Sequence, residues 1–152
     1  KRFADKGISV FLPIDHVVVE EIVAEAPTSV VECGQVGPSQ RVVDIGPKTT
    51  EMYSQILLGQ HAEVVRPQTV FWNGPMGIFE MEAFSQGTID VARALSQSSA
   101  VSVVGGGDSA AAVRRAGVDE MVSHVSTGGG AALAYLSGEV LPGLAALRGG
   151  RR

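Results

Sequence analysis

The sequence contains one cysteine, Cys33, so it cannot form a disulfide within the chain. We expect Cys33 to be a small buried residue in a protein of a reducing compartment. Positive charge is also scarce. Twelve Lys and Arg residues face 16 Asp and Glu residues, and the net charge of −4 argues against a nucleic-acid partner. No apolar run approaches the roughly 18 residues of a membrane span, which argues against a membrane partner.

Lysine is much scarcer than arginine. Only Lys1, Lys6 and Lys48 occur, and none is near the glycine-rich segments around residues 105 and 128. Transfer of a phosphoryl group requires cations on the moving phosphate. The sequence therefore allows nucleotide binding but shows no cationic clamp for catalysis.

The composition is otherwise that of a globular domain, with 152 residues, 45% hydrophobic content and 19 glycines. The first seven residues resemble the last turn of a helix closed by Gly7, so we interpret residue 1 as a cut.

Apolar strand patterns alternate with helical patterns, which predicts a parallel sheet covered on both faces. The expected strands are 8–12, 69–72, 101–104 and 121–125, and one or two minor strands fall between residues 17 and 44. One helix is expected to begin at Pro47, and three others are expected at 82–97, 108–116 and 130–136.

The segment 101–112 is the most informative. The strand Val101–Val104 stops at three glycines, and Asp108, Ser109 and an alanine-rich helix follow. Glycine lets the backbone N–H groups approach a phosphate, and a helix N-terminus favours negative charge. Asp108 can also contact Mg²⁺, which prefers carboxylate oxygens.

Two further turns end predicted strands. Residues 126–130 contain Gly128, Gly129 and Gly130 before a helix, and residues 73–80 contain Asn73, Pro75 and Glu80. Ligands of parallel sheets bind beyond the carboxyl ends of the strands. Two adjacent glycine turns favour an anion site over purely structural turns, and Glu80 is a candidate for ribose hydroxyls.

Other motifs carry less information. The pattern Gly105-x-Gly107-x-x-Ala110 matches a dinucleotide fingerprint, but no acidic residue ends the next strand, which argues against NAD. The three histidines share no metal-ligand spacing. For Asp15, a functional carboxylate and a turn or cap are both open.

Four motifs together resemble the C-terminal half of phosphoglycerate kinase, in the family's order and at similar spacing. The motifs are DIGPKT (44–49), FWNGPMGIFE (71–80), GGGDS (105–109) and SHVSTGGGA (123–131). The resemblance implies a Rossmann-like, three-layer α/β/α fold. Residues 1–147 would form part of the nucleotide-binding domain, followed by a disordered tail at 148–152.

The resemblance also implies a function. Members of the family are phosphotransferases with a carboxyl group as acceptor, and they transfer a phosphoryl group between 1,3-bisphosphoglycerate and Mg-ADP in glycolysis. They are usually cytoplasmic monomers. The implied nucleotide contacts are Asn73, Pro75, Glu80, Gly106, Gly107, Asp108 and Ser109. Asp108 would lie toward Mg²⁺, and Gly128, Gly129 and Gly130 would face the transferring phosphoryl group.

The departures are large. The family's N-terminal domain, which holds 3-phosphoglycerate, is missing, together with the strands and phosphate-binding lysines that open its C-terminal domain. We therefore expect ADP or ATP as a ligand and no turnover by this chain alone. Residues 8–12 should lack a strand partner. The alternative is a non-catalytic nucleotide-binding or interaction module that pairs with a separate chain.

Overall fold

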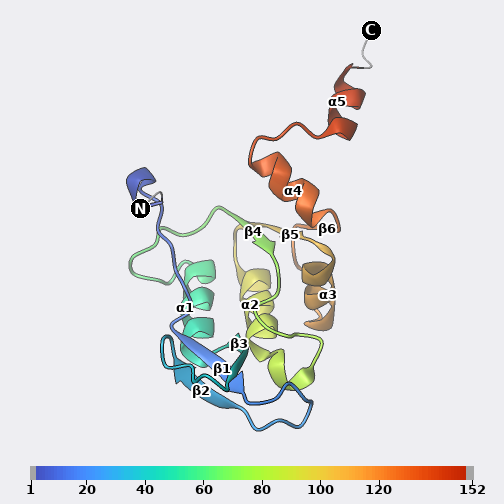
Figure 1. Ribbon diagram of the computed structural model, residues 1–152. Coiled ribbons are helices and arrows are strands. Elements are labelled where there is room, and N and C mark those ends of the chain that lie inside the picture. Colours follow the sequence, from blue (N-terminus) through green and yellow to red (C-terminus); the bar gives the residue numbers. More distant parts are fainter. Residues whose placement is uncertain (1–2, 150–152) are drawn as a thin grey trace.

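The computed structural model describes residues 3–149, which form two sheets and five α-helices (Figure 1). The antiparallel sheet has the order β2-β1-β3 and contains β1 (Asp15–Val19), β2 (Ser29–Glu32) and β3 (Arg41–Ile45). The parallel sheet has the order β4-β5-β6 and contains β4 (Thr69–Asn73), β5 (Val101–Gly105) and β6 (His124–Ser126). The helices are α1 (Pro47–Leu58), α2 (Gln86–Gln97), α3 (Gly107–Arg115), α4 (Gly129–Leu136) and α5 (Pro142–Gly149). Two 3-10 turns are η1 (Ala4–Lys6) and η2 (Glu82–Phe84).

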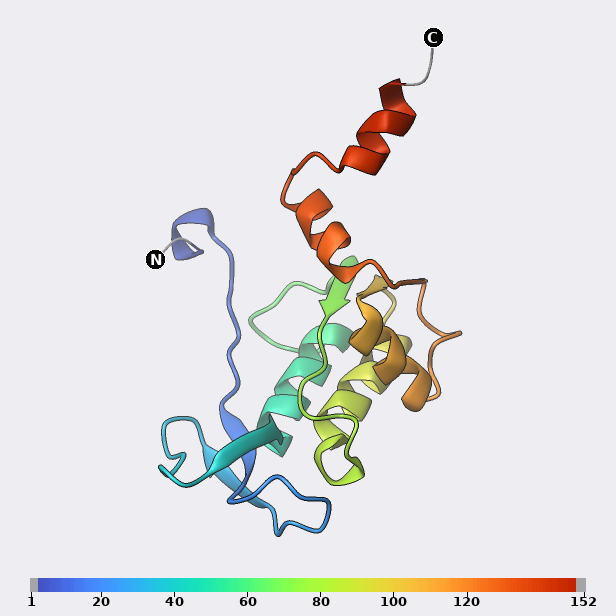
Figure 2. The ribbon, with the colours of Figure 1, turned by 45° about the vertical axis from the view of Figure 1, so that its right-hand side comes forward.

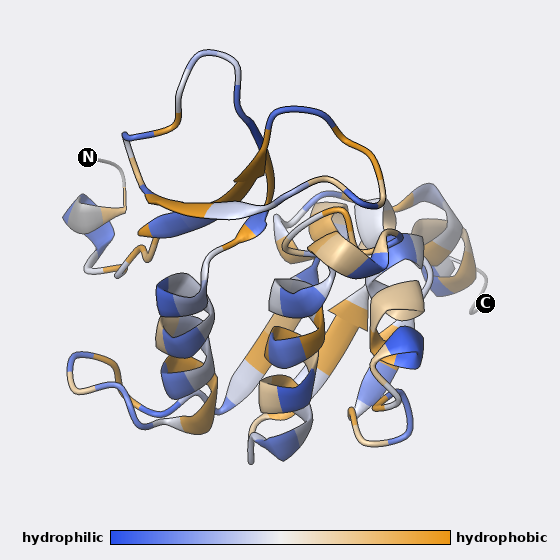
Figure 3. Cartoon of the chain, turned by 90° about the horizontal axis from the view of Figure 1, so that it is seen from below, coloured by the Kyte–Doolittle hydropathy of each residue, from blue (hydrophilic) through white to orange (hydrophobic). Residues whose placement is uncertain are grey.

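Three helices form a layer against one face of the parallel sheet. Figure 3 shows α1, α2 and α3 side by side in front of the sheet. Trp72 and Val104 point into this interface, where they pack with Leu95 of α2 and Val113 of α3. Branched and aromatic residues on the strands therefore meet the apolar stripes of the helices, and the predicted α/β fold with a parallel sheet is confirmed.

The opposite face of the parallel sheet is only partly covered. Alternate residues of a strand point to opposite faces, so Val101 and Val103 lie on the other side from Val104. Val101 is 55% exposed. Near the carboxyl ends of the strands, α4 leaves a hollow of about 470 Å³ over this face, lined by Thr69, Phe71, Val103, His124, Ser126, Ala132, Tyr135 and Leu136. Figures 1 and 2 both show α4 and α5 extending away from the helix layer.

The local sequence explains where the helices begin and end. Pro47 occupies the first turn of α1, where its missing N–H is not needed, and Gly59 ends that helix with a φ of +70°. The predicted helix 82–97 is divided into η2 and α2 at Ser85. No helix within residues 3–149 is long and apolar enough to cross a bilayer.

The prediction of a strand at 8–12 is wrong. Residues 8–13 make no strand ladder, although Ile8, Val10 and Leu12 alternate as exposed apolar side chains. A strand needs a hydrogen-bonded neighbour, and among the described residues none pairs with this segment. In Figures 1 and 2 the segment runs apart from both sheets.

Two further expectations need correction. Cys33 is exposed because it follows the end of β2 in a surface turn. The predicted tail does not begin at residue 148, because Arg148 and Gly149 belong to α5. Pro142 fits the first turn of that helix, and Leu144 and Leu147 lie one turn apart on it. The remainder of the predicted tail, 150–152, lies outside the described residues.

Candidate functional site

The three predicted turns meet at the carboxyl edge of the parallel sheet. Asn73 at the end of β4 pairs with Gly105 at the end of β5, and Gly105 pairs with Ser126 at the end of β6. The segments that follow these strands therefore leave the sheet side by side. This confirms the predicted convergence of the three turns.

The two glycine turns are in direct contact. A Cβ atom added to Gly129 would lie 2.7 Å from the Cα of Gly106. Gly106 has a φ of +100°, which side-chain-bearing residues rarely adopt, and its N–H donates to the carbonyl of Ser126 at 2.8 Å. The Asn73 amide Nδ2 donates to the carbonyl of Gly129 at 3.4 Å. Glycine at 106 and 129 thus permits a backbone approach that larger residues would prevent.

This contact places the first turns of α3 and α4 at the same edge. The helices begin at Gly107 and Gly129, and within residues 3–149 no side chain caps either N-terminus. The first N–H groups of a helix lack partners in that helix and carry partial positive charge. Two such ends beside each other form a suitable binding place for an anion.

The two longest helices, α1 and α2, have protein carboxylates at their first turns. Asp15 accepts hydrogen bonds from the N–H groups of Lys48 and Thr49 at the start of α1, at 3.0 and 2.8 Å. Asp44 accepts one from Gly87 at the start of α2, at 2.7 Å. Asp15 is therefore a capping residue. A distant carboxylate thus accepts N–H groups at the starts of α1 and α2, whereas no side chain of the described residues accepts those at the starts of α3 and α4.

Both capping carboxylates are buried, yet their pKa values move in opposite directions. Burial raises the pKa of Asp44 to about 6, against the opposing effect of N–H donors from Gly87 and Ile45. Burial also acts on Asp15, but hydrogen bonds from the Thr49 hydroxyl and from the N–H groups of Thr49 and Lys48 lower its pKa below the ordinary value. Asp15 has the larger set of donors to its ionised form.

Asp108 and Ser109 have different surroundings. Asp108 is exposed in the first turn of α3, with its carboxylate free of protein hydrogen bonds among the described residues. Ser109 is 1% exposed, and its Oγ accepts a hydrogen bond from the N–H of Gly74 at 2.6 Å. The Ser109 hydroxyl oxygen is thus engaged inside the protein, where it holds the first residue of the loop after β4.

The loop after β4 extends from the glycine turns along α3. Pro75 is half-buried and Glu80 is exposed. The carbonyl of Glu80 accepts a hydrogen bond from Arg115 at the C-terminal end of α3, at 3.0 Å. The nine residues of α3, at 1.5 Å each, make a helix of about 13 Å. Glu80 therefore lies toward the other end of α3 from Asp108.

Metal ligands and lysines are sparse around these turns. Residues 3–149 contain no group of three His, Cys, Asp or Glu side chains that could hold a metal ion. Lys48 pairs with Glu32 of β2 at 2.8 Å on the exposed surface beside the antiparallel sheet. The described site thus consists mainly of backbone N–H groups, with Asp108 as its charged side chain.

Comparison with known proteins identifies the fold and the family. The model of the family described as "Phosphoglycerate kinase" matches residues 1–139. The chain belongs to the phosphoglycerate kinase family. This confirms the resemblance of the four motifs.

Individual relatives agree with this assignment. Phosphoglycerate kinase from Solibacter usitatus is 52% identical over 95% of this chain and 34% of its own length. The Clostridium tetani enzyme is 46% identical over 97% of this chain and 35% of its own length. The structure of phosphoglycerate kinase from Coxiella burnetii superposes with a TM-score of 0.82 at 38% identity, covering 91% of this chain and 34% of the other. The chain thus spans about a third of the length of its relatives.

Proposed function

We propose that this chain supplies the nucleotide-binding side of a phosphoglycerate kinase. The observation that carries the proposal is the pair of helix N-termini, α3 and α4, which lie beside each other without a capping side chain. A nucleotide phosphate would provide the negative charge that Asp15 and Asp44 provide at α1 and α2.

The site residues divide into two parts under this proposal. The turn at residues 106–109 holds the nucleotide phosphates, with the backbone N–H groups of Gly107 and Asp108 as donors, and Gly128, Gly129 and Gly130 face the transferring phosphoryl group. Asn73, Pro75 and Glu80 line the cleft beside the nucleoside, with Glu80 toward the ribose. The separation of Glu80 from Asp108 along α3 supports contact with two different parts of one nucleotide.

Magnesium enters as part of the substrate, Mg-ADP. Mg²⁺ is commonly held by one or two carboxylates together with substrate phosphates. One exposed carboxylate, Asp108, fits this arrangement, whereas a site made of protein ligands alone would need more donors than the described residues provide.

We infer that the chain does not transfer a phosphoryl group by itself. Transfer needs cations around the moving phosphate, and the two lysines of the described residues are Lys6 in η1 and Lys48, which pairs with Glu32 of β2. The glycolytic reaction with 1,3-bisphosphoglycerate or 3-phosphoglycerate, and the cytoplasmic, monomeric state of the family, belong to the longer enzyme in this proposal. The chain contributes its nucleotide half.

Calorimetric titration of the 152-residue chain with Mg-ADP tests the proposal. We expect saturable binding at one site, and binding at least about tenfold weaker in Asp108→Ala, the loss of one charged contact. Asp119→Ala is the matched control, because it removes the same charge from an exposed position beyond the far end of α3. Absence of Mg-ADP binding by the folded chain, or detectable kinase turnover by it, would contradict the proposal.

A second candidate function is a non-catalytic module that pairs with another polypeptide. The exposed side chains of Ile8, Val10 and Leu12, together with the exposed face around Val101, favour it. Mass measurement by light scattering distinguishes the two. A stable complex with a separately encoded chain would support the module, and a monomer that binds Mg-ADP would support the first proposal.

A further inference from the structure

The loop between β4 and η2 is held by a buried hydroxyl group. Thr88 in α2 has no exposed surface, and its Oγ1 accepts hydrogen bonds from the N–H groups of Met76 and Gly77 at 3.0 and 3.2 Å. A hydroxyl oxygen has two acceptor lone pairs, so Thr88 satisfies two consecutive backbone donors of the loop.

Thr88 is itself fixed in place. It follows Gly87, whose N–H donates to the Asp44 carboxylate at 2.7 Å. A Cβ atom on Gly87 would lie 2.5 Å from Cγ1 of Ile45, so α2 is packed tightly against the end of β3. The first turn of α2 therefore presents the hydroxyl at a defined position relative to the central core.

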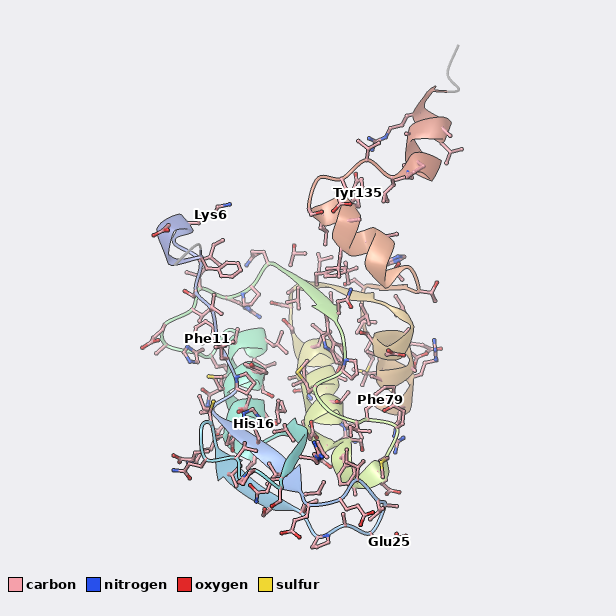
Figure 4. All side chains as sticks on the ribbon, in the orientation of Figure 1. Lys6, Phe11, His16, Glu25, Phe79 and Tyr135 are labelled. Atoms are coloured by element: carbon pink, nitrogen blue, oxygen red, sulfur yellow. The ribbon has the colours of Figure 1, made fainter. Side chains whose placement is uncertain are left out.

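The ligand-contact residues lie on both sides of this anchor. Pro75 directly precedes Met76, and Glu80 follows Gly77 by three residues. Ile78 N–H donates to the carbonyl of Val43 at 2.8 Å, and Phe79 is buried beside α3 (Figure 4). The anchored middle of the loop thus determines where Pro75 and Glu80 lie.

We propose that Thr88 is a positioning residue of the nucleotide site. This inference rests on the proposed function, because it assigns Pro75 and Glu80 to the nucleoside. Thr88 lies in the buried interface behind the loop and acts through the backbone of Met76 and Gly77. A side chain of the same shape without the hydroxyl would leave both N–H groups without an acceptor, and the loop would have to move to hydrate them.

The test compares Thr88→Val, which keeps the shape, with Thr88→Ser, which keeps the hydroxyl, in the 152-residue chain. Thr50→Val is the matched control, because the Thr50 hydroxyl donates to the carbonyl of Gly46, the residue before α1, and makes no hydrogen bond to the loop. Amide exchange measured by NMR reports on Met76 and Gly77, with Val104 of β5 as the internal reference. Calorimetry gives the Kd for Mg-ADP.

In Thr88→Val we expect exchange of the Met76 and Gly77 amides to increase about tenfold relative to Val104. The Kd for Mg-ADP should rise by about tenfold, the effect of one lost hydrogen bond. Thr88→Ser should restore both values, and Thr50→Val should change neither. A purely structural role would accelerate all three amides alike and leave the Kd of the folded fraction unchanged.

Two results would overturn the inference. One is an unaltered Kd in Thr88→Val, and the other is a failure of Thr88→Ser to recover the loop exchange and the Kd. If the unaltered chain does not bind Mg-ADP, the proposed function fails and the positioning role fails with it. Loss of binding in Thr88→Val alone leaves the proposed function intact, so the two failures are distinguishable.

Discussion

Asp44 provides the most quantitative test of the structure, because it is a buried carboxylate whose pKa is raised from its ordinary value of 3.8 to about 6. Desolvation by burial is the largest cause, and the nearby Asp90 adds to it, while N–H donors from Gly87 and Ile45 oppose it. Asp44 is 3% exposed, so solvent screens this effect little. The difference in pKa corresponds to roughly 3 kcal/mol between the protonated and ionised forms.

The direction in which the unfolding free energy changes with pH follows from the proton affinities of the native and unfolded states. The native state binds the Asp44 proton more tightly than the unfolded state does, so the free energy of unfolding rises as the pH falls. The gain starts as the pH falls through about 6 and is complete below 3.8. Between about pH 7.5 and pH 5, the native carboxyl takes up its proton and the unfolded one does not. The expected gain over this interval is roughly 1 kcal/mol.

Urea unfolding at several pH values, followed by the fluorescence of Trp72, measures this gain. Trp72 is the only tryptophan and is buried in the core. The comparison is with Asp44→Asn, which keeps the shape and cannot ionise. Asparagine has one acceptor oxygen for the two N–H donors, so its absolute stability changes for a second reason and the pH dependence is the informative quantity.

We expect the unfolding free energy of the original chain to rise by roughly 1 kcal/mol more than that of Asp44→Asn as the pH falls through this interval. All other titrating groups are common to both proteins, so the difference isolates Asp44. Equal pH dependence in the two proteins would refute the assignment of a raised pKa to Asp44. A larger rise in the unfolding free energy of Asp44→Asn than of the original chain would mean that the pKa of Asp44 is lowered in the native state.

Two other substitutions test the packing around the site. Gly77→Ala should destabilise the fold by about 1–3 kcal/mol, because its Cβ would lie 2.5 Å from the backbone carbonyl oxygen of Val43. The control is Gly143→Ala, where the added Cβ meets no neighbour within 4 Å. Equal unfolding midpoints of the two variants would show that the loop around Gly77 can move freely. Thr49→Val should cost about 1–3 kcal/mol because the Asp15 carboxylate loses its 2.6 Å hydroxyl donor. Asp15 has a lowered pKa, so it stabilises the fold above its ordinary pKa of 3.8 and loses that contribution as the pH falls through its native pKa. Acid unfolding of Thr49→Val should therefore depend less on pH in this range, and an unchanged acid profile would contradict the role of Thr49.

The sequence predicted elements most accurately where the pattern was local. The strands β4 and β5 and the helices α3 and α4 lie where apolar runs and glycine turns indicated. The convergence of their turns followed from a general property of parallel sheets, and the register of β4, β5 and β6 confirms it.

Sequence patterns were less informative where structure depends on distant partners. Residues 8–12 have the composition of a strand but no neighbour among the described residues, so no strand forms. Cys33 has an apolar side chain but lies in an exposed turn. In both cases a residue's own preference was overridden by its surroundings.

The proposed ligand-facing residues stand in motifs that the sequence shows, whereas the residues that support them do not. Glycines, Asp108 and Glu80 stand in recognisable motifs, whereas Thr88 lies in an ordinary helix and acts through contacts 11 and 12 residues away. Asp44 stands in a quoted motif, but nothing local indicates that it caps α2, 43 residues later in the chain. The motif containing Ser109 predicts a place at the phosphates, and nothing local indicates that its hydroxyl oxygen accepts a hydrogen bond from the N–H of Gly74.

The most direct test of the central claim is the affinity of Gly129→Ala for Mg-ADP, measured by calorimetry beside Gly143→Ala. A Cβ at 129 would lie 2.7 Å from the Cα of Gly106 and would push the two glycine turns apart, whereas a Cβ at 143 meets nothing within 4 Å. If these turns together hold the nucleotide phosphates, Gly129→Ala should bind at least about tenfold more weakly while Gly143→Ala binds like the original chain. Equal affinity of a folded Gly129→Ala would contradict the claim that the paired N-termini of α3 and α4 form the site.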